Sequence, residues 1–149
     1  MQGLRWVQIS PKERDAFLGD GGTGVLSFST PAEEPPWLLP ISYGYDANTK
    51  LLYFSLSFPA GSTKPAVVDE PVAFATHDET PDGWRSVVAV GRLEEVADMP
   101  YESSAVQGLW TVEIPAVDIF DRPREEVTFR DFVLDPETIT GRKEVQTES

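Results

Sequence analysis

The sequence contains no cysteine and one histidine, His77. Without cysteine there is no disulfide, no thiolate metal ligand and no thiol nucleophile. One histidine does not supply a multi-histidine metal site, and it argues against a Ser-His-Asp triad. The composition therefore points away from catalysis by metal-bound or nucleophilic side chains.

Long hydrophobic runs are missing as well. No apolar stretch approaches the length that spans a membrane, and the N-terminal sequence MQGLRWVQISPKERD lacks the apolar centre of a signal peptide. We therefore expect a cytoplasmic protein. A chain of 149 residues suits one domain with a substantial core, so we expect residues 1–149 to form a single domain.

Basic residues are scarce: 12 lysines and arginines stand against 25 aspartates and glutamates, for a formal net charge of −13. This charge repels nucleic acid, and no basic stripe interrupts it. Because 40% of the residues are hydrophobic and 11% aromatic, the chain has enough apolar material for a core. We interpret the charge as the surface of a folded, halophilic protein, which concerns habitat and solubility rather than activity.

The order of the predicted elements indicates a small β-barrel. Ser10, Pro11 and Glu13 have the pattern of a helix start with a capping box, and Gly19 ends that helix. Short strands with few helices favour a closed or half-closed barrel. The six extended segments are Gly24–Thr30, Trp37–Asp46, Leu51–Ser57, Pro71–Glu79, Trp84–Val96 and Val127–Asp135.

Other local features are less regular. We expect a short helical turn at KPAVVDE, a helix within Met99–Trp110 and a loose tail after Gly141. Pro40 removes a backbone donor from its strand, which predicts a bulge, an edge or a ligand-facing stretch there. Gly91 predicts a bend or bulge in the long strand around it.

The stretch GSTKP, Gly61 to Pro65, has the chemistry of a phosphate site. A Gly-Ser-Thr turn before a helix start offers backbone N–H groups, two hydroxyls and the helix dipole, with Lys64 as a point charge. The same pattern also serves as an ordinary strand-to-helix connection. On these residues alone both interpretations stay open.

Two other stretches have a similar ambiguity. Arg85 and Ser86, at the start of a strand, are placed to reach an anion, whereas Arg85 could equally pair with one of the many surface carboxylates. Pro40 in LLPISYG leaves backbone groups without partners, which a flat polar heterocycle could use. A proline-guarded edge strand has the same pattern.

The order of these stretches resembles a known family. The sequence reads GVLSFST, PWLLPISYGYD, KLLYFSLS, GSTKPAVV, PVAFAT and WRSVVAVGRLEEV from Gly24 to Val96. This is similar to the pyridoxamine 5′-phosphate oxidase-like family of FMN-binding split barrels. In that family a Pro-Val-Ser strand, a Tyr-Phe strand, a Gly-Ser-Arg-Lys turn and a strand with Ser or Gln before VxVxG follow one another. FVLDPETITGRK adds a weaker similarity near the end.

The resemblance implies a six-stranded antiparallel Greek-key split barrel, which forms a homodimer with FMN at the subunit interface. The residues expected to hold the phosphate are Ser62, Thr63, Lys64, Arg85 and Ser86. Those expected along the isoalloxazine ring and ribityl chain are Pro40, Ile41, Ser42, Tyr53, Phe54 and Ser55.

The sequence departs from the family in three ways. Thr63 stands where arginine is common, so the turn has one basic residue, and Pro71 ends the following helix early. The C-terminal part also lacks the arginine and histidine pattern that grips substrate in true pyridoxamine phosphate oxidases. We therefore do not expect vitamin B6 oxidation.

The leading functional hypothesis is an FMN-dependent oxidoreductase that acts on a small organic substrate, with a reduced nicotinamide or another donor. Because the flavin itself carries the hydride chemistry, no catalytic side chain is assigned. One alternative is a flavin carrier or sensor without turnover. Another is the same barrel with a deazaflavin or haem, where His77 would be the one conventional haem ligand. The last is a barrel without cofactor that serves as an interaction module.

Overall fold

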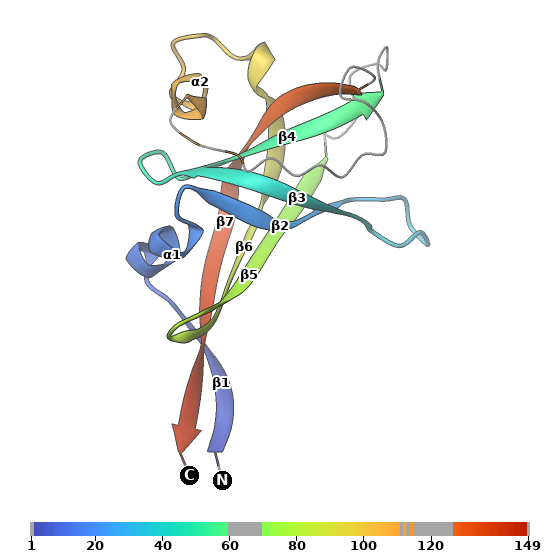
Figure 1. The fold of residues 1–149 in the computed structure, drawn as a ribbon. Coiled ribbons are helices and arrows are strands. Elements are labelled where there is room, and N and C mark those ends of the chain that lie inside the picture. Colours follow the sequence, from blue (N-terminus) through green and yellow to red (C-terminus); the bar gives the residue numbers. More distant parts are fainter. Residues whose placement is uncertain (1, 60–69, 111, 113, 115–126, 149) are drawn as a thin grey trace.

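The computed structural model describes residues 2–59, 70–110, 112, 114 and 127–148 (Figure 1). In chain order the elements are β1 (Gln2–Gln8), α1 (Pro11–Leu18), β2 (Gly21–Phe28), β3 (Trp37–Asp46), β4 (Leu51–Pro59), β5 (Pro71–Thr80), β6 (Gly83–Glu95), the 3-10 helix η2 (Val96–Asp98), α2 (Ser104–Leu109) and β7 (Val127–Glu148). β3 has the predicted bounds, whereas β2 begins before its predicted start at Gly24. The helical turn predicted at KPAVVDE lies outside the described residues, apart from Glu70.

Six of the strands close into an antiparallel barrel. Their order is β7-β4-β3-β2-β5-β6, and β6 pairs back with β7 to complete the ring. Because β5 lies beside β2, the four strands β2 to β5 form a Greek key. Figure 1 places both α-helices outside this ring. The mainly-β split barrel predicted from the sequence is therefore confirmed.

The last strand, β7, holds the barrel together and extends beyond it. Its 22 residues pair first with β4, then with β6 and finally with β1. In Figure 1, β1 and the end of β7 project from the barrel as a two-stranded ribbon. The loose tail predicted after Gly141 is wrong, because the backbone of this segment pairs with β1. The sequence analysis did not predict β1.

The barrel is split between β3 and β4. These strands pair only from Tyr43 to Asp46 of β3, whereas β4 continues along β7 as far as Pro59. In the described part of the chain, the β4-facing edge of β3 before Tyr43 has no strand partner. Pro40, opposite Val25 of β2, lies on this open edge, where a missing N–H costs no ladder bond. The prediction of an edge at Pro40 is confirmed.

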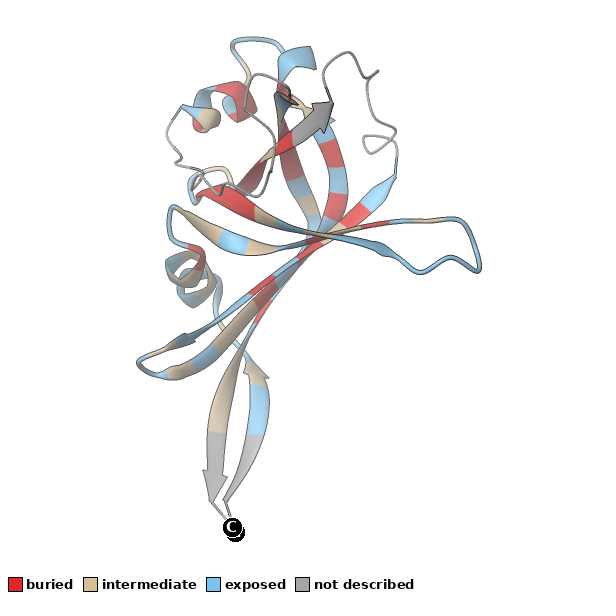
Figure 2. Ribbon diagram, turned by 45° about the vertical axis from the view of Figure 1, so that its right-hand side comes forward, coloured by how far each residue is buried: buried red, intermediate tan, exposed pale blue. Residues whose placement is uncertain are grey.

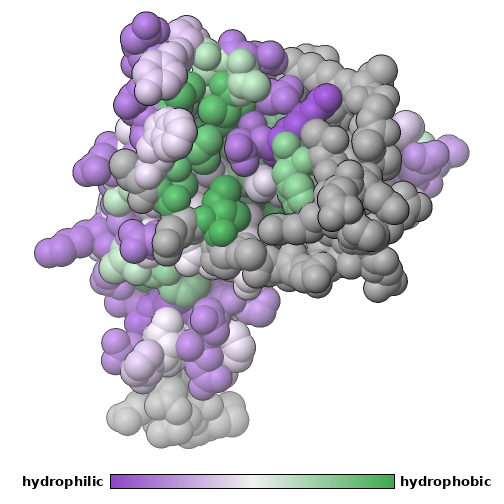
Figure 3. All heavy atoms as spheres, turned by 45° about the horizontal axis from the view of Figure 1, so that its top comes forward, coloured by the Kyte–Doolittle hydropathy of each residue, from purple (hydrophilic) through white to green (hydrophobic). Residues whose placement is uncertain are grey.

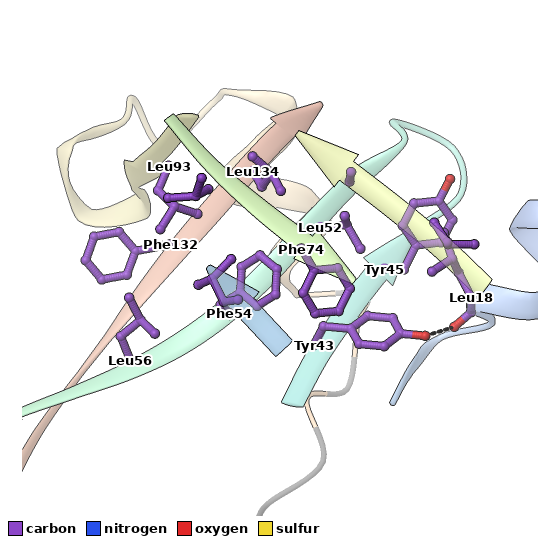
Figure 4. Close-up of a cluster of buried hydrophobic side chains, with 14 of the residues drawn as sticks. Leu18, Tyr43, Tyr45, Leu52, Phe54, Leu56, Phe74, Leu93, Phe132 and Leu134 are labelled. Atoms are coloured by element: carbon purple, nitrogen blue, oxygen red, sulfur yellow. Dashed lines mark hydrogen bonds between the residues drawn. The ribbon is translucent and has the colours of Figure 1, made fainter. Parts of the chain in front are cut away.

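The barrel interior is filled by aromatic and aliphatic side chains (Figure 4), and Figure 2 shows buried residues along the strands of the barrel. Phe74 makes edge contacts with the rings of Tyr43 and Phe54, at centroid distances of 5.2 and 5.0 Å. The Tyr43 hydroxyl donates to the carbonyl of Leu18, 3.0 Å away, which ties α1 to the end of this core. Burying such residues supplies the main stabilisation of the fold.

A second apolar cluster lies on the outer side of the barrel. Tyr53 is fully buried in it, and its hydroxyl donates to the carbonyl of Ala105 in α2 at 2.6 Å. Burial raises the pKa of Tyr53 to about 12, with a further contribution from Asp46. We call this the outer cluster; its buried members are Leu51, Tyr53, Val96, Ala105, Val106 and Val133. Figure 3 looks onto this end of the barrel and shows apolar surface among hydrophilic side chains.

The helix predicted within Met99–Trp110 is present as the shorter α2, and one glycine lets it approach the barrel. A Cβ atom on Gly108 would lie 2.5 Å from the Tyr53 hydroxyl oxygen and 2.8 Å from a carboxylate oxygen of Asp46. Any side chain at this position would therefore push α2 away from β4.

The first helix, α1, begins as predicted and is held by polar contacts. The Ser10 hydroxyl accepts from the backbone N–H of Glu13 at 3.1 Å, whereas the Glu13 carboxylate lies 3.4 Å from Lys143 instead of closing the capping box. Asp15 accepts hydrogen bonds from Tyr45, at 2.6 Å, and from Lys50. Burial alone would raise the pKa of Asp15, but these bonds and the Lys50 charge lower it below its usual value.

The predicted irregularity at Gly91 is a β-bulge. The register between β6 and β7 shifts between Val90 and Gly91, where Val90 faces Thr138 and Gly91 faces Pro136. A Cβ atom on Gly91 would lie 2.8 Å from the Asp135 carbonyl oxygen. The bulge lets β7 bend from β4 towards β6. Within the described ranges, no helix is both long and apolar enough to cross a membrane.

Candidate functional site

Polar side chains gather on the outer side of the barrel where β3 leaves β4. Side chains alternate along a strand, so Phe54 and Leu56 of β4 point into the interior whereas Tyr53 and Ser55 point outward. The same alternation in β3 places Tyr43 inside and Ser42 outside. The outward positions beside the split are therefore available for chemistry that the core does not use.

Three of these residues lie on neighbouring strands. Ser55 of β4 is directly opposite Asp131 of β7, and its hydroxyl hydrogen-bonds to the Asp131 carboxylate. The last paired position of β3 before the split is Tyr43, opposite Phe54. One step further along β3, at the start of its unpaired edge, is Ser42. We call Ser42, Ser55 and Asp131 the split cluster.

The polar groups of the split cluster have few hydrogen-bond partners. The Ser42 hydroxyl oxygen is buried and has no hydrogen-bond partner in the part of the chain that the structure describes. Burial raises the pKa of Asp131, and the hydrogen bond from Ser55 offsets this in part. Buried polar groups are normally paired, so an unpartnered buried hydroxyl makes the edge of β3 at Ser42 a candidate binding site.

The six residues predicted along the flavin ring do not share one environment. Pro40, Ser42 and Ser55 point to the outer side, whereas Ile41 packs against the barrel interior. Phe54 is fully buried in that interior and Tyr53 in the outer cluster. The side chains of Tyr53 and Phe54 are therefore part of the two apolar clusters, and their backbones pair with β3 on one side and β7 on the other.

Two of the five predicted phosphate residues, Arg85 and Ser86, lie in the described part of the chain. Ser62, Thr63 and Lys64 lie outside the described residues.

Arg85 and Ser86 also differ from each other. As neighbours on β6 they point to opposite sides of the sheet. The Arg85 guanidinium donates to the carbonyls of Asp82 and Trp84, at 3.4 and 3.1 Å, within its own hairpin. One protomer therefore brings Arg85 and Ser86 to opposite faces, and a single anion between them is not favoured.

The outer side of β2, β3, β5, β6 and β7 carries a second feature, an area without charge. Two rows of outward residues cross these strands in register. We call them the uncharged face: Pro40, Val25, Ala75, Val88 and Thr140 in one row, and Leu38, Ser27, Ala73, Val90 and Thr138 in the next. Although 25% of the chain is charged, these ten adjacent positions carry no charge, and four of them are exposed Leu or Val.

Asp131 is the member of the split cluster that the sequence analysis missed. The signal is present in VTFRDFVLD, where Asp131 shares a strand face with Phe129 and Val133. A lone acid between apolar residues at a spacing of two indicates a carboxylate on a partly buried face. Its partner Ser55 is distant in sequence, so the pairing itself needs the structure. The described residues contain no group of three or more potential metal ligands.

The chain belongs to the pyridoxamine 5′-phosphate oxidase family, because residues 10–143 match the profile of the family with that description. This confirms the resemblance found in the sequence. No curated protein matches the sequence.

Solved structures with the same fold agree with this assignment. An FAD-binding protein from Mycobacterium smegmatis superposes with a TM-score of 0.64 at 18% identity, covering 93% of this chain and 98% of that one. A conserved protein of unknown function from Corynebacterium diphtheriae gives 0.62 at 18% identity, covering 94% and 98%. An FAD-binding protein from Mesorhizobium loti gives 0.57 at 18% identity, covering 96% and 99%.

Proposed function

We propose that this protein binds a flavin and acts as a flavin-dependent oxidoreductase on a small organic substrate. The observation that carries the proposal is the buried Ser42 hydroxyl, which has no partner among the described residues and lies at the start of the open edge of β3 in a barrel of this family. A planar heterocycle with ring carbonyl and N–H groups would pair with this hydroxyl group. Two structural neighbours are described as FAD-binding, which supports a flavin in general.

FMN is our first choice of flavin and FAD our second. The segment Ser62–Lys64 supplies the hydroxyls and the one lysine for a terminal phosphate, as the family resemblance implies. The names of the neighbours favour FAD. A deazaflavin would satisfy the split cluster equally, because it keeps the carbonyl and N–H edge. When bound, the flavin would supply hydride and single-electron transfer.

The active form in this proposal is a homodimer with the cofactor at the subunit interface. This assembly is the one that the family resemblance implies for Ser62–Lys64, Arg85 and Ser86. The uncharged face supplies an apolar surface for that contact. Its outward serine, threonine and aliphatic residues carry no charge that would repel an identical copy.

Flavin binding is tested by titrating FMN, and separately FAD, with the protein in molar salt and following the quenching of flavin fluorescence. Saturation at one flavin per chain is expected. Lys64→Ala should weaken FMN binding about tenfold, because it removes a charge-assisted phosphate contact, while Lys12→Ala on exposed α1 should not. An absence of saturable binding would overturn the proposal.

Turnover separates an oxidoreductase from the alternative, a carrier that binds flavin without reaction. The flavin-loaded protein is mixed anaerobically with NADH or NADPH, and the flavin absorbance near 450 nm (about that of free flavin) is followed. Rapid bleaching, and recovery on adding an organic acceptor, support the enzyme. A flavin that stays oxidised with every donor supports the carrier.

A further inference from the structure

We propose that the ribbon formed by β1 and the end of β7 is a dimerisation arm, which docks on a second copy of this chain. The ribbon consists of Gln2–Gln8 paired with Arg142–Glu148. This role rests on the homodimer of the proposed function and extends it, because it adds a second contact surface to the uncharged face.

Within one chain, few contacts hold the ribbon. From Glu144 onward, β7 pairs only with β1 among the described strands, and in Figure 1 this part reaches beyond every other labelled element. An isolated pair of strands is marginally stable at best in water, and a third strand or a packed face is needed to hold it. Trp6, on this ribbon, is 50% exposed. A second copy that packs on the ribbon would supply the missing contact.

The two faces of the ribbon differ in what lies against them. On one face, the Lys143 amino group is 3.4 Å from the Glu13 carboxylate of α1. Neighbouring residues of a strand point to opposite sides, so Arg142 lies on the other face, which it shares with Gln8 and Trp6 through the β1–β7 register. All three of these side chains are exposed. The face directed away from α1 is therefore the one available for docking.

That available face continues the uncharged face in register. Val88 and Thr140 of the uncharged face are a pair between β6 and β7, and two positions further along both strands is the pair Ser86 and Arg142. Arg142 in turn pairs with Gln8 of β1. One surface of the sheet thus runs without a break from the barrel onto the ribbon.

Exposed tryptophans lie on this continuation. Trp84, two positions before Ser86 on β6, is 37% exposed, and its ring centroid is 5.8 Å from that of His77. Trp6 lies two positions before Gln8, on the ribbon itself. Tryptophan is enriched among the residues that contribute most to binding at protein interfaces. The aromatic residues therefore favour an interface that includes the ribbon.

The size of the uncharged face leads to the same conclusion. A stable interface takes about 20–30 residues from each partner, and the ten positions of the uncharged face are at most about half of that number. An interface between two copies therefore has to extend beyond the uncharged face. The rows that lead to the ribbon are a continuous extension that carries exposed tryptophans.

The charge of the ribbon fits another copy of this chain. The ribbon has three basic and two acidic residues, whereas the whole chain has 12 basic and 25 acidic residues. The rest of the molecule is therefore strongly acidic, and a weakly basic ribbon is attracted to it rather than repelled. This complementarity favours a second copy as the partner.

Hydrogen exchange of the wild-type protein at a series of concentrations tests the arm, with light scattering at each concentration to measure the dimer fraction. The amides of Gln2–Gln8 should exchange at least about tenfold more slowly when the protein is dimeric than when it is monomeric, because docking opposes the local opening that exposes them. The amides of Ala47–Lys50, in the β3–β4 turn, are the internal control and should change little.

A pair of tryptophan variants gives a second measurement. Trp6→Ala should raise the dissociation constant of the dimer at least about tenfold, because it removes an aromatic contact from the arm. Trp110→Ala removes a side chain that is 74% exposed at the end of α2, and it should leave the dissociation constant within about twofold of wild type. Thermal melts of both variants at high dilution check that the monomers stay folded.

The outcomes separate the arm from the dimer. A dimer whose ribbon exchanges at the same rate as in the monomer, or a dimer that Trp6→Ala leaves as tight as wild type, would overturn the inference while the proposed homodimer stands. A wild-type protein that is monomeric at every concentration would overturn both. Flavin binding is measured by its own titration and does not depend on either result.

Discussion

The outside of the barrel has two apolar areas, and they differ in whether the described part of the chain covers them. The outer cluster beside β4 is covered by the chain's own α2 and η2, and its central residue Tyr53 is fully buried. The uncharged face on β2, β3, β5, β6 and β7 has no such cover in the described part of the chain, and Val88 is 41% exposed there. The split cluster lies between the two areas.

The difference indicates separate tasks for the two sides. A covered apolar area contributes to the stability of one chain, whereas an exposed one contributes only when something docks on it. Changes in the outer cluster should therefore alter the free energy of unfolding. Changes on the uncharged face should alter assembly and leave the fold intact.

The largest effect is expected from Tyr53→Ala. It removes a fully buried ring and the hydrogen bond to Ala105, so the free energy of unfolding should fall by about 3–5 kcal/mol. Urea unfolding at fixed protein concentration measures this. The matched change Val88→Ala, on the uncharged face, should cost less than about 1 kcal/mol. Equal losses would remove the distinction between the two sides.

Gly108→Ala should come next. The added methyl group would overlap the Tyr53 hydroxyl oxygen and the Asp46 carboxylate, so α2 must shift away from β4. A loss of about 1–3 kcal/mol in the free energy of unfolding is expected from this overpacking, measured by urea unfolding. Retention of full stability would show that α2 does not pack closely on β4 over the outer cluster.

The two helices differ in the same way, and pH separates them. Both helices bury apolar residues, but of the two only α1 is also held through an ionised side chain in the described residues, that of Asp15, whose pKa is lowered. A lowered pKa in the folded state means that the stabilisation is present at neutral pH and is lost as pH falls through the folded value. Asp15→Asn should therefore cost about 1 kcal/mol near pH 7 and almost nothing near pH 2. A pH-independent difference in urea unfolding would contradict this.

Val88→Glu should have the smallest effect on folding and a clear effect on assembly. In the proposed dimer a carboxylate buried between two uncharged faces would cost several kcal/mol, so light scattering should show a monomer mass for Val88→Glu and a dimer mass for wild type. The melting temperature of the monomer should stay near that of wild-type monomer at high dilution. Ala47→Glu, in the exposed β3–β4 turn, is the control and should leave the dimer intact.

Much of the barrel could be predicted because its signals are local. Alternating residues, turns and Pro40 fixed the bounds of β3 and the open edge beside it. β1 and the end of β7 were missed because both are polar and are strands only through pairing with each other across the whole chain. Such pairing leaves no local pattern.

The site was less accessible to sequence reasoning. Ser42 and Ser55 came from family order, but Asp131, the partner of Ser55, lies on a strand some 76 positions later and became visible only through the β4–β7 register. We expected Tyr53 and Phe54 to lie along the flavin ring without considering which face of β4 each side chain occupies. Their alternation with Ser55 contained that information.

The most direct test of flavin binding is the visible absorbance spectrum of wild-type protein mixed with FMN in molar salt and then desalted into the same buffer. High salt screens the repulsion between the phosphate and a chain of net charge −13, so the local contacts decide the result. We expect a yellow protein that retains one flavin per chain. A colourless protein, with FAD as with FMN, would contradict the proposed function.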